Sequence, residues 1–316
     1  MIFKNTFKLL LTNFNLTYKV FLYKLIVLLL AFGVAGTAGM PFLTHLQSIG
    51  FYNFAADKFV FMFESFNISN IFIGVKDVFL KIIEIFASLD GTILVNAIIA
   101  ICIFVVVLGL FGSLDELAVM DVLNANLTSK TKLSFFKSLV GKTFKSFLKS
   151  IVKFVISLPY LACLGVILYY GFIFYDSLGA IYKIIIPMAM FLSITILSGF
   201  YLSLTAGFCP NIIVHDNGVF KSLKNGFKAI RKKYFKLLSS SIMLVFVILI
   251  CNIFLSVYSF LAGLIITIPI TIVVLDLFKI ISFYECSGMR YYVGDEIRTP
   301  LRKEELDKMN KLKYII

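Results

Sequence analysis

Six stretches of this sequence are apolar over about 20 residues or more, the length a helix needs to cross the hydrocarbon core of a bilayer. A soluble domain could not bury them all, because 60% of the 316 residues are hydrophobic and soluble domains are usually about 45–50% apolar. We therefore predict an all-α integral membrane protein with about six transmembrane helices arranged as three hairpins. The predicted spans are Phe21–Leu43, Thr92–Gly112, Phe154–Tyr175, Ile184–Phe208, Leu237–Phe260 and Leu261–Phe283.

The first apolar stretch has an alternative interpretation as a cleaved signal peptide. Its end, AFGVAGTAG at 31–39, has the small residues of a cleavage site. However, the segment that precedes the apolar run is long for a signal peptide, and Lys24 interrupts the run. We expect a retained helix.

The distribution of positive charge predicts the orientation of the spans. Of the 30 Lys and Arg residues, 26 lie in segments 1–24, 114–153, 214–236 and 276–316, which alternate with the other connections. Because Lys and Arg are enriched on the cytoplasmic side of membrane proteins, we place both termini in the cytoplasm, with the chain in the cell membrane. The abundance of Phe, Tyr, Ile and Lys is typical of an AT-rich bacterial genome. The net charge of +13 thus reports topology, and we expect no nucleic-acid partner.

Three similar basic segments precede the first, third and fifth spans. They are FKNTFKLLLTNF (3–14), FKSLVGKTFKSFLK (136–149) and FKSLKNGFKAIRKKYFK (220–236). In each segment, aromatic and aliphatic residues recur every three or four positions beside lysines, as on an amphipathic interfacial helix. We predict a single polytopic domain, 1–316, with repeat-like units at 1–113, 114–208 and 209–284 and a cytoplasmic tail at 285–316.

The lysines of these segments favour contact with anionic lipid headgroups, because the rings can sink to the acyl boundary while the ammonium groups reach outward. The alternative is that the lysines only fix topology and anchor the helix ends. The candidate lipid contacts are Lys142, Lys145, Lys149, Lys221, Lys224, Lys228, Arg231 and Lys232.

An insertion at 44–91 separates the first two spans on the outer side. Ile71, Val75, Ile82 and Phe86 trace one face of a helix within it. We expect this segment to cap the bundle as a lid or to lie on the outer leaflet. An exposed apolar face would equally suit a partner protein.

Recognisable catalytic, metal and cofactor motifs are absent from the sequence, so we expect no cofactor. The five cysteines lack metal-ligand or CxxC spacing and are typical of buried apolar residues. Asp276 and Lys279 stand three residues apart in the last span and can form an intramembrane ion pair. Asp115–Glu116 and His215–Asp216 each follow an outward-to-inward span, and we interpret them as helix-end and capping residues.

The segment CPNIIVHDNGVFKSLKNGFKAIRKKYFKLL (209–238) resembles a pattern in poorly characterised bacterial multi-pass proteins, including the membrane domain joined to some glycerophosphoryl diester phosphodiesterases. Pro210, Asp216, Gly218, Phe220 and Phe227 occupy corresponding places, whereas the small Ala and Ser positions of that helix are not clearly kept. The resemblance implies the architecture alone, because the phosphodiesterase domain has no counterpart here.

These observations predict a non-enzymatic component of the cytoplasmic membrane that engages anionic lipid or a membrane protein partner. The first alternative is a small permease with a path between the repeats. The second is a lipid-modifying enzyme, which would need His215, Asp216 and Asp115 or Glu116 to meet at one membrane face.

Overall fold

The computed structural model describes residues 2–64, 68–129, 131–177, 182–231, 233–259, 262–293 and 296–298. Nearly all of this part of the chain is helical, as the sequence predicts. In chain order the elements are α1 (Ile2–Thr12), α2 (Phe14–Ala38), α3 (Met40–Ser48), α4 (Phe51–Phe63), α5 (Ile68–Ser88), α6 (Gly91–Leu110), the 3-10 turn η1 (Phe111–Ser113), α7 (Asp115–Ser129), α8 (Phe135–Gly141), α9 (Thr143–Ser177), α10 (Tyr182–Thr205), α11 (Phe208–Val214), α12 (Val219–Arg231), α13 (Tyr234–Tyr258), α14 (Gly263–Ser287), β1 (Tyr291–Val293) and β2 (Glu296–Arg298).

Six helical segments of the described part of the chain are long and apolar enough to cross a membrane, in agreement with the expected number of candidate spans. Two of them continue through a break in the helix, α6 into α7 and α10 into α11. The segments are Phe14–Ala38, Gly91–Ser129, Thr143–Tyr175, Tyr182–Val214, Tyr234–Tyr258 and Gly263–Ser287.

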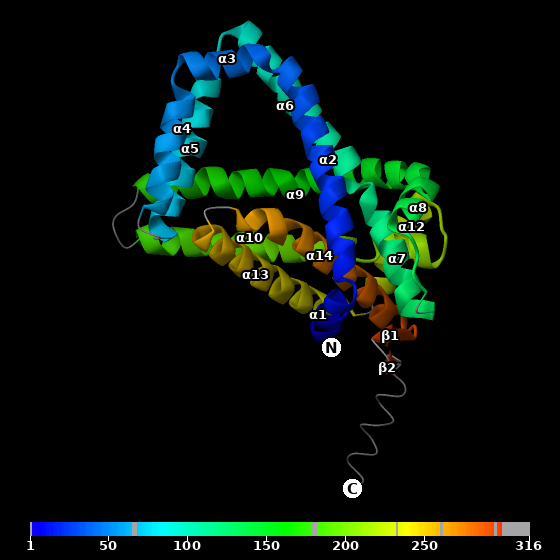
Figure 1. Ribbon diagram of the computed structural model, residues 1–316. Helices are drawn as coiled ribbons and strands as arrows, with labels where there is room; N and C mark the ends of the chain where they lie inside the picture. The colour runs from blue at the N-terminus through cyan, green and yellow to red at the C-terminus, as the bar shows by residue number, and fades with distance from the viewer. Residues whose placement is uncertain are drawn as a thin grey trace.

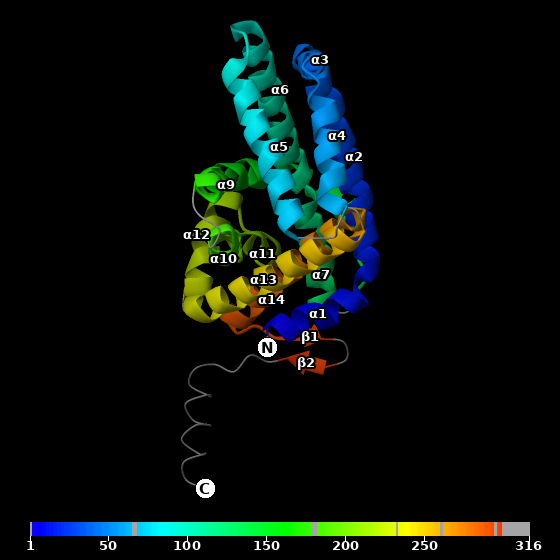
Figure 2. The same cartoon turned by 90° about the vertical axis from the view of Figure 1, so that its left-hand side faces the viewer.

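The long helices pack in two groups (Figures 1 and 2). Helices α2 and α6 lie side by side and rise to α3, while α9, α10, α13 and α14 form a second group in which α10 contacts both α9 and α13. The short elements α1, α7, α8, α11, α12 and the β1–β2 pair gather at one end of this second group. We call this the basic end, because the three basic segments lie there.

The insertion at 44–91 forms a pair of helices, α4 and α5, which contact each other and run from α3 to the far ends of α9 and α10 (Figure 1). Phe72 of α5 contacts Phe172 and Tyr175 of α9, with ring centroids 5.4 and 4.9 Å apart. The face of α5 differs from the sequence expectation, since Val75 is 46% exposed whereas Lys76 is buried against the Tyr175 ring. The pair therefore braces the two groups of long helices against each other.

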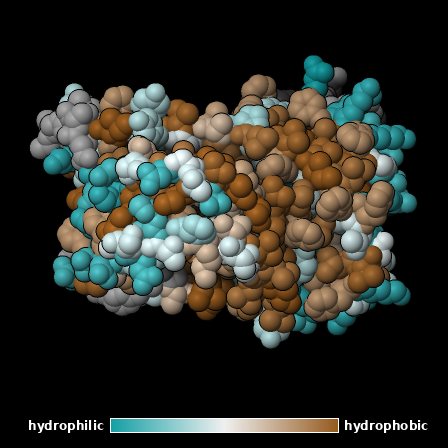
Figure 3. Space-filling model, turned by 90° about the horizontal axis from the view of Figure 1, so that it is seen from above, coloured by the Kyte–Doolittle hydropathy of each residue, from teal (hydrophilic) through white to brown (hydrophobic). Residues whose placement is uncertain are grey.

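The surface of the long helices is hydrophobic. Seen from above, a broad region of hydrophobic residues lies between hydrophilic residues along the right-hand margin and a mixed polar area on the left (Figure 3). Large apolar side chains of every span are exposed, among them Leu29, Val106, Tyr170, Ile196, Phe254 and Ile266. Water would penalise such a surface, whereas lipid chains would not.

The most deeply buried part of the described chain lies at the basic end. Helix α7 and the second half of α14 are almost wholly buried there, and both pack against α11. The antiparallel pair of β1 and β2, three residues in each strand, follows α14 directly. Its Tyr291 is 1% exposed, and the Tyr291 hydroxyl accepts a hydrogen bond from Asn5 of α1 at 2.8 Å. This short strand pair ties the last span to the first helix and is an addition to the all-α prediction.

Each of the three basic segments begins with a short helix that ends before a long one starts. Helix α1 ends ahead of Asn13, α8 ahead of Lys142, and α12 at Arg231. Helix α12 packs closely against the break between α10 and α11 at two glycines. A Cβ on Gly226 would lie only 2.6 Å from the carbonyl carbon of Gly207. The two backbones touch because neither residue carries a side chain.

Candidate functional site

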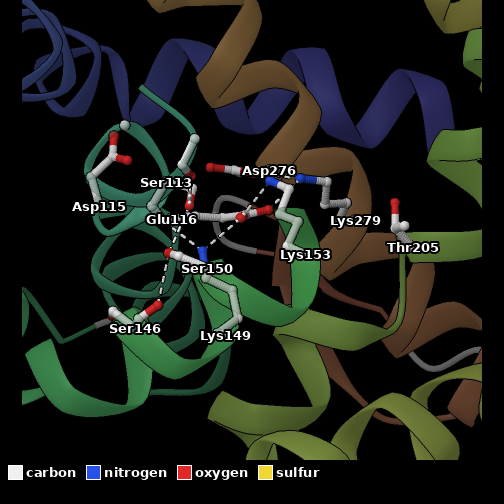
Figure 4. Close-up of polar contacts among 12 residues, drawn as sticks. Ser113, Asp115, Glu116, Ser146, Lys149, Ser150, Lys153, Thr205, Asp276 and Lys279 are labelled. Carbon is white, nitrogen blue, oxygen red and sulfur yellow. Dashed lines mark hydrogen bonds and ion pairs between the residues drawn. The ribbon is translucent and has the colours of Figure 1, made fainter. Parts of the chain in front are cut away.

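A cluster of buried charges lies where α7, α9 and α14 meet at the basic end, and Glu116 is its centre (Figure 4). The Glu116 carboxylate accepts hydrogen bonds from three lysines. Lys153 and Lys149 of α9 lie 2.7 and 2.9 Å from Oε2, and Lys279 of α14 lies 2.5 Å from Oε1. One carboxylate from the second span thus binds two other spans together.

Asp276 joins this cluster through Lys279. Its Oδ1 lies 3.1 Å from the Lys279 ammonium, so that lysine bridges two carboxylates. Asp276 is 2% exposed, and its Oδ2 has no hydrogen-bond partner among the described residues. The ion pair expected from the spacing of these two residues is therefore present, within a larger group.

Asp115 and Lys24 extend the cluster toward α2. The Lys24 ammonium lies 2.7 Å from Asp115 Oδ1, and Asp115 itself is fully buried. The Asp115 Oδ2 also has no partner within the part of the chain that the structure describes. Every one of the three predicted repeat units thus contributes charged side chains to this region.

The break between α6 and α7 positions these side chains. Carbonyls at a break in a helix lack partners within the helix, and here lysines bind two carbonyls of the turn η1 between α6 and α7. Lys24 donates to the Gly112 carbonyl and Lys149 to the Ser113 carbonyl. The turn η1 then places Asp115 and Glu116 at the start of α7, facing the same lysines.

The charges of the cluster do not cancel. Glu116 and Asp276 face three ammonium groups, and Lys24 balances Asp115, which leaves one excess positive charge. Burial of ions is costly unless each is paired and hydrogen-bonded. Lys153 resolves part of that cost, since 28% of its side chain remains exposed whereas Lys149 has none exposed.

Three lysines of the second basic segment bind carboxylates of the protein itself. Lys142 lies 2.6 Å from Asp121 of α7, and Lys149 is enclosed in the cluster. Lys145 lies 2.5 Å from Asp216, and this hydrogen bond holds the pKa of the exposed Asp216 below its usual value. The prediction that these three lysines contact lipid therefore needs correction for Lys149, whose ammonium is buried beside Glu116.

The basic residues of α12 behave differently. Lys221, Lys224, Lys228 and Arg231 are exposed, and no ion pair engages them within the described part of the chain. Lys232, the remaining candidate lipid contact, lies outside the described residues. Four basic residues of α12 are thus exposed, whereas Lys142, Lys145 and Lys149 form ion pairs within the protein.

Residues that the lipid-enzyme alternative needs are engaged separately. Glu116 is surrounded by lysines, Asp216 is exposed and bonded to Lys145, and the His215 ring packs edge-on against Phe283 at 5.8 Å. In the described residues no group of three or more His, Cys, Asp or Glu side chains is placed to hold a metal ion.

Comparison with known proteins gives no match to a family model, a curated protein or a solved structure. The resemblance to the membrane domain of glycerophosphoryl diester phosphodiesterases therefore stays a prediction. The interpretation of this chain depends on its own geometry.

Sequence reasoning missed the role of Glu116 and did not single out Lys153. The sequence predicts Asp115–Glu116 as helix-end residues, and α7 does begin there, but Glu116 also pairs with three lysines. The available signal was the presence of acids and lysines at the same depth of three different spans. Because a charged residue inside a membrane is energetically costly, such residues are expected to form ion pairs with one another.

Proposed function

We propose that the protein is a non-enzymatic, multi-pass component of the bacterial cytoplasmic membrane that binds anionic lipid headgroups through α12. In this proposal the basic end faces the cytoplasm, each pair of spans forms a hairpin, and α12 is an amphipathic helix at the headgroup level. A membrane protein partner is compatible with the same surface.

The observation that carries the proposal is the placement of exposed aromatic rings beside exposed cations on α12. Phe220 and Phe227 are 67% and 46% exposed, although both belong to the apolar stripe of the helix. Ile230 of the same stripe is 1% exposed and packs inward. The outward rings suit the acyl boundary, and each nearby basic residue adds about 1 kcal/mol of attraction to an anionic surface.

The test is the preference of the full-length protein for anionic lipid. Spin-labelled phosphatidylglycerol should associate with the reconstituted protein more strongly than spin-labelled phosphatidylcholine, and added salt should weaken that preference. Neutralising Lys221, Lys224, Lys228 and Arg231 to Gln should reduce it. The control K81Q/K183Q removes charge from the opposite end and should leave it unchanged. Equal association of the two lipids with the wild-type protein contradicts the proposal.

A small permease is the second candidate, and the buried Asp276 favours it. An ionisable side chain buried within a membrane span, as Asp276 is, is a typical feature of ion and proton pathways. If this is the function, D276N should abolish uptake of a solute by cells at unchanged protein level. An uptake profile identical to that of the wild type removes this candidate.

A further inference from the structure

An open groove of about 560 Å³ lies at the basic end, where α11, α12 and the end of α14 meet. Its size is within the range of about 300–1,000 Å³ that is usual for small-molecule sites. Phe283 of α14 is one of its lining residues, and most of the others are polar or cationic, among them His215, Asn217, Lys221, Asn225 and Lys228.

The charge of this groove is positive and unopposed. Lys221 and Lys228 line it, and no Asp or Glu is among its described lining residues. Neither lysine has an ion-pair partner in the part of the chain that the structure describes. Asp216, next to His215 in the sequence, is exposed and already bonded to Lys145 of α9.

The spacing of the polar side chains on α12 sets them on one face. Lys221, Asn225 and Lys228 stand at i, i+4 and i+7, which are neighbours along a helix surface. Lys224 and Arg231 have the same charge but do not line the groove. Instead they lie on the side of Phe220 and Phe227, within about 60° of both rings around the helix by the 3.6-residue period.

We propose that this groove binds a phosphate group, carried either by an anionic phospholipid headgroup or by a small soluble phosphate ester. Two ammonium groups match a phosphate better than a carboxylate, because phosphate offers more acceptor oxygens and, as a monoester, up to two charges. The amide groups of Asn225 and Asn217 add hydrogen-bond donors. The first turn of α12 borders the groove, and its macrodipole also favours an anion.

This inference rests on the proposed function, which places α12 at the headgroup level. It adds one defined binding site to the general attraction between the cations of α12 and anionic lipid. If only the general positive charge of α12 attracted the phosphate, neutralising either pair of its four cations would weaken binding equally. A built groove distinguishes Lys221 and Lys228 from Lys224 and Arg231, so the two pairs form matched variants with the same loss of charge on the same helix.

The experiment compares K221Q/K228Q with K224Q/R231Q in the full-length protein. One arm titrates sn-glycerol 3-phosphate into protein in phosphatidylcholine nanodiscs, and the other counts phosphatidylglycerol retained in native mass spectrometry after detergent extraction. We expect K221Q/K228Q to weaken binding at least tenfold in one arm, while K224Q/R231Q stays within twofold of the wild type.

The arm that responds identifies the source of the phosphate. Loss in the glycerol phosphate arm indicates a soluble ester, and loss of one retained phosphatidylglycerol indicates a lipid headgroup. Equal effects of the two variants in both arms, or no binding by the wild type in either arm, would overturn the groove as a site. The spin-label preference described above is measured separately, so a failure of the groove and a failure of general lipid binding give different results.

Discussion

Lys279 of α14 donates a hydrogen bond to Glu116 of α7 across 2.5 Å, although 163 positions separate the two residues in the chain. Glu116 also binds Lys149 and Lys153 of α9, so the same carboxylate fixes the last span and the third span to the second. Lipid gives helices little hydrophobic reason to associate, because its chains are as apolar as the helices. Buried ion pairs are therefore a natural means of fixing their arrangement.

Replacement of Glu116 by Gln should strongly destabilise the protein. The substitution keeps the shape of the side chain but leaves three lysines without their shared counter-charge. Breaking a buried ion pair by removing one partner costs about 3–5 kcal/mol. We expect a clear drop in the midpoint of thermal unfolding of the detergent-solubilised protein, measured by scanning fluorimetry with a thiol-reactive dye.

The matched control for that experiment is E84Q. Glu84 also pairs with a lysine, Lys81 at 3.0 Å, but its side chain is 68% exposed. Exposed ion pairs contribute about 0–1 kcal/mol, so E84Q should leave the midpoint almost unchanged. Similar midpoints for E116Q and E84Q would show that the buried cluster does not hold the spans together.

Gly226 should not tolerate alanine. A Cβ at this position would lie 2.6 Å from the carbonyl carbon of Gly207, so α12 would have to move away from the α10–α11 break. We expect G226A to lower both thermal stability and the anionic-lipid preference that depends on α12. The control G165A adds a Cβ where no atom lies within 4 Å and removes a helical glycine, so it should be neutral or stabilising by up to about 1 kcal/mol. Equal stability of the two variants would contradict the contact.

The spans could be predicted from the sequence because the length of an apolar run is a local property. The pair of Asp276 and Lys279 was predictable for the same reason, since the two residues stand one helical turn apart. The partners of Lys149 and Glu116 were not, because they depend on how α7 and α9 pack. The sequence predicts lysines of the second and third basic segments as lipid contacts. Only the structure distinguishes the internally paired Lys142 from the exposed Lys224.

Orientation in the membrane can be tested with reporter fusions. The excess of Lys and Arg at the basic end predicts that this end is cytoplasmic. Fusions after Lys132 and Lys236 should therefore give high activity of a cytoplasm-active reporter, and fusions after Lys81 and Lys183 should give high activity of a periplasm-active reporter. The opposite pattern at all four positions would reverse the topology, and a mixed pattern would change the number of spans.

Removal of the Tyr291 hydroxyl tests the link between the strand pair and α1. The hydroxyl accepts from Asn5 at 2.8 Å and donates to Glu285 at 2.7 Å, so Y291F leaves the side chains of both residues without a hydrogen-bond partner among the described residues. Loss of such hydrogen bonds costs about 1–3 kcal/mol, which should appear as a lower thermal midpoint. Y18F, which removes the hydroxyl of a tyrosine of α2 that is 61% exposed, serves as the comparison.

The effect of Y291F should not vary with pH between about 6 and 9. Burial, and then the hydrogen bond to Glu285, raise the pKa of Tyr291 above its usual value, so the phenol stays neutral through this range. A group with a raised pKa in the folded state contributes stability that is fully present below the pKa of the unfolded chain, about 10, and is lost as the pH rises through the folded value. Thermal midpoints of both proteins at several pH values measure this. A difference that disappears between pH 6 and 9 would mean that the Tyr291 hydroxyl ionises early and is not buried between Asn5 and Glu285.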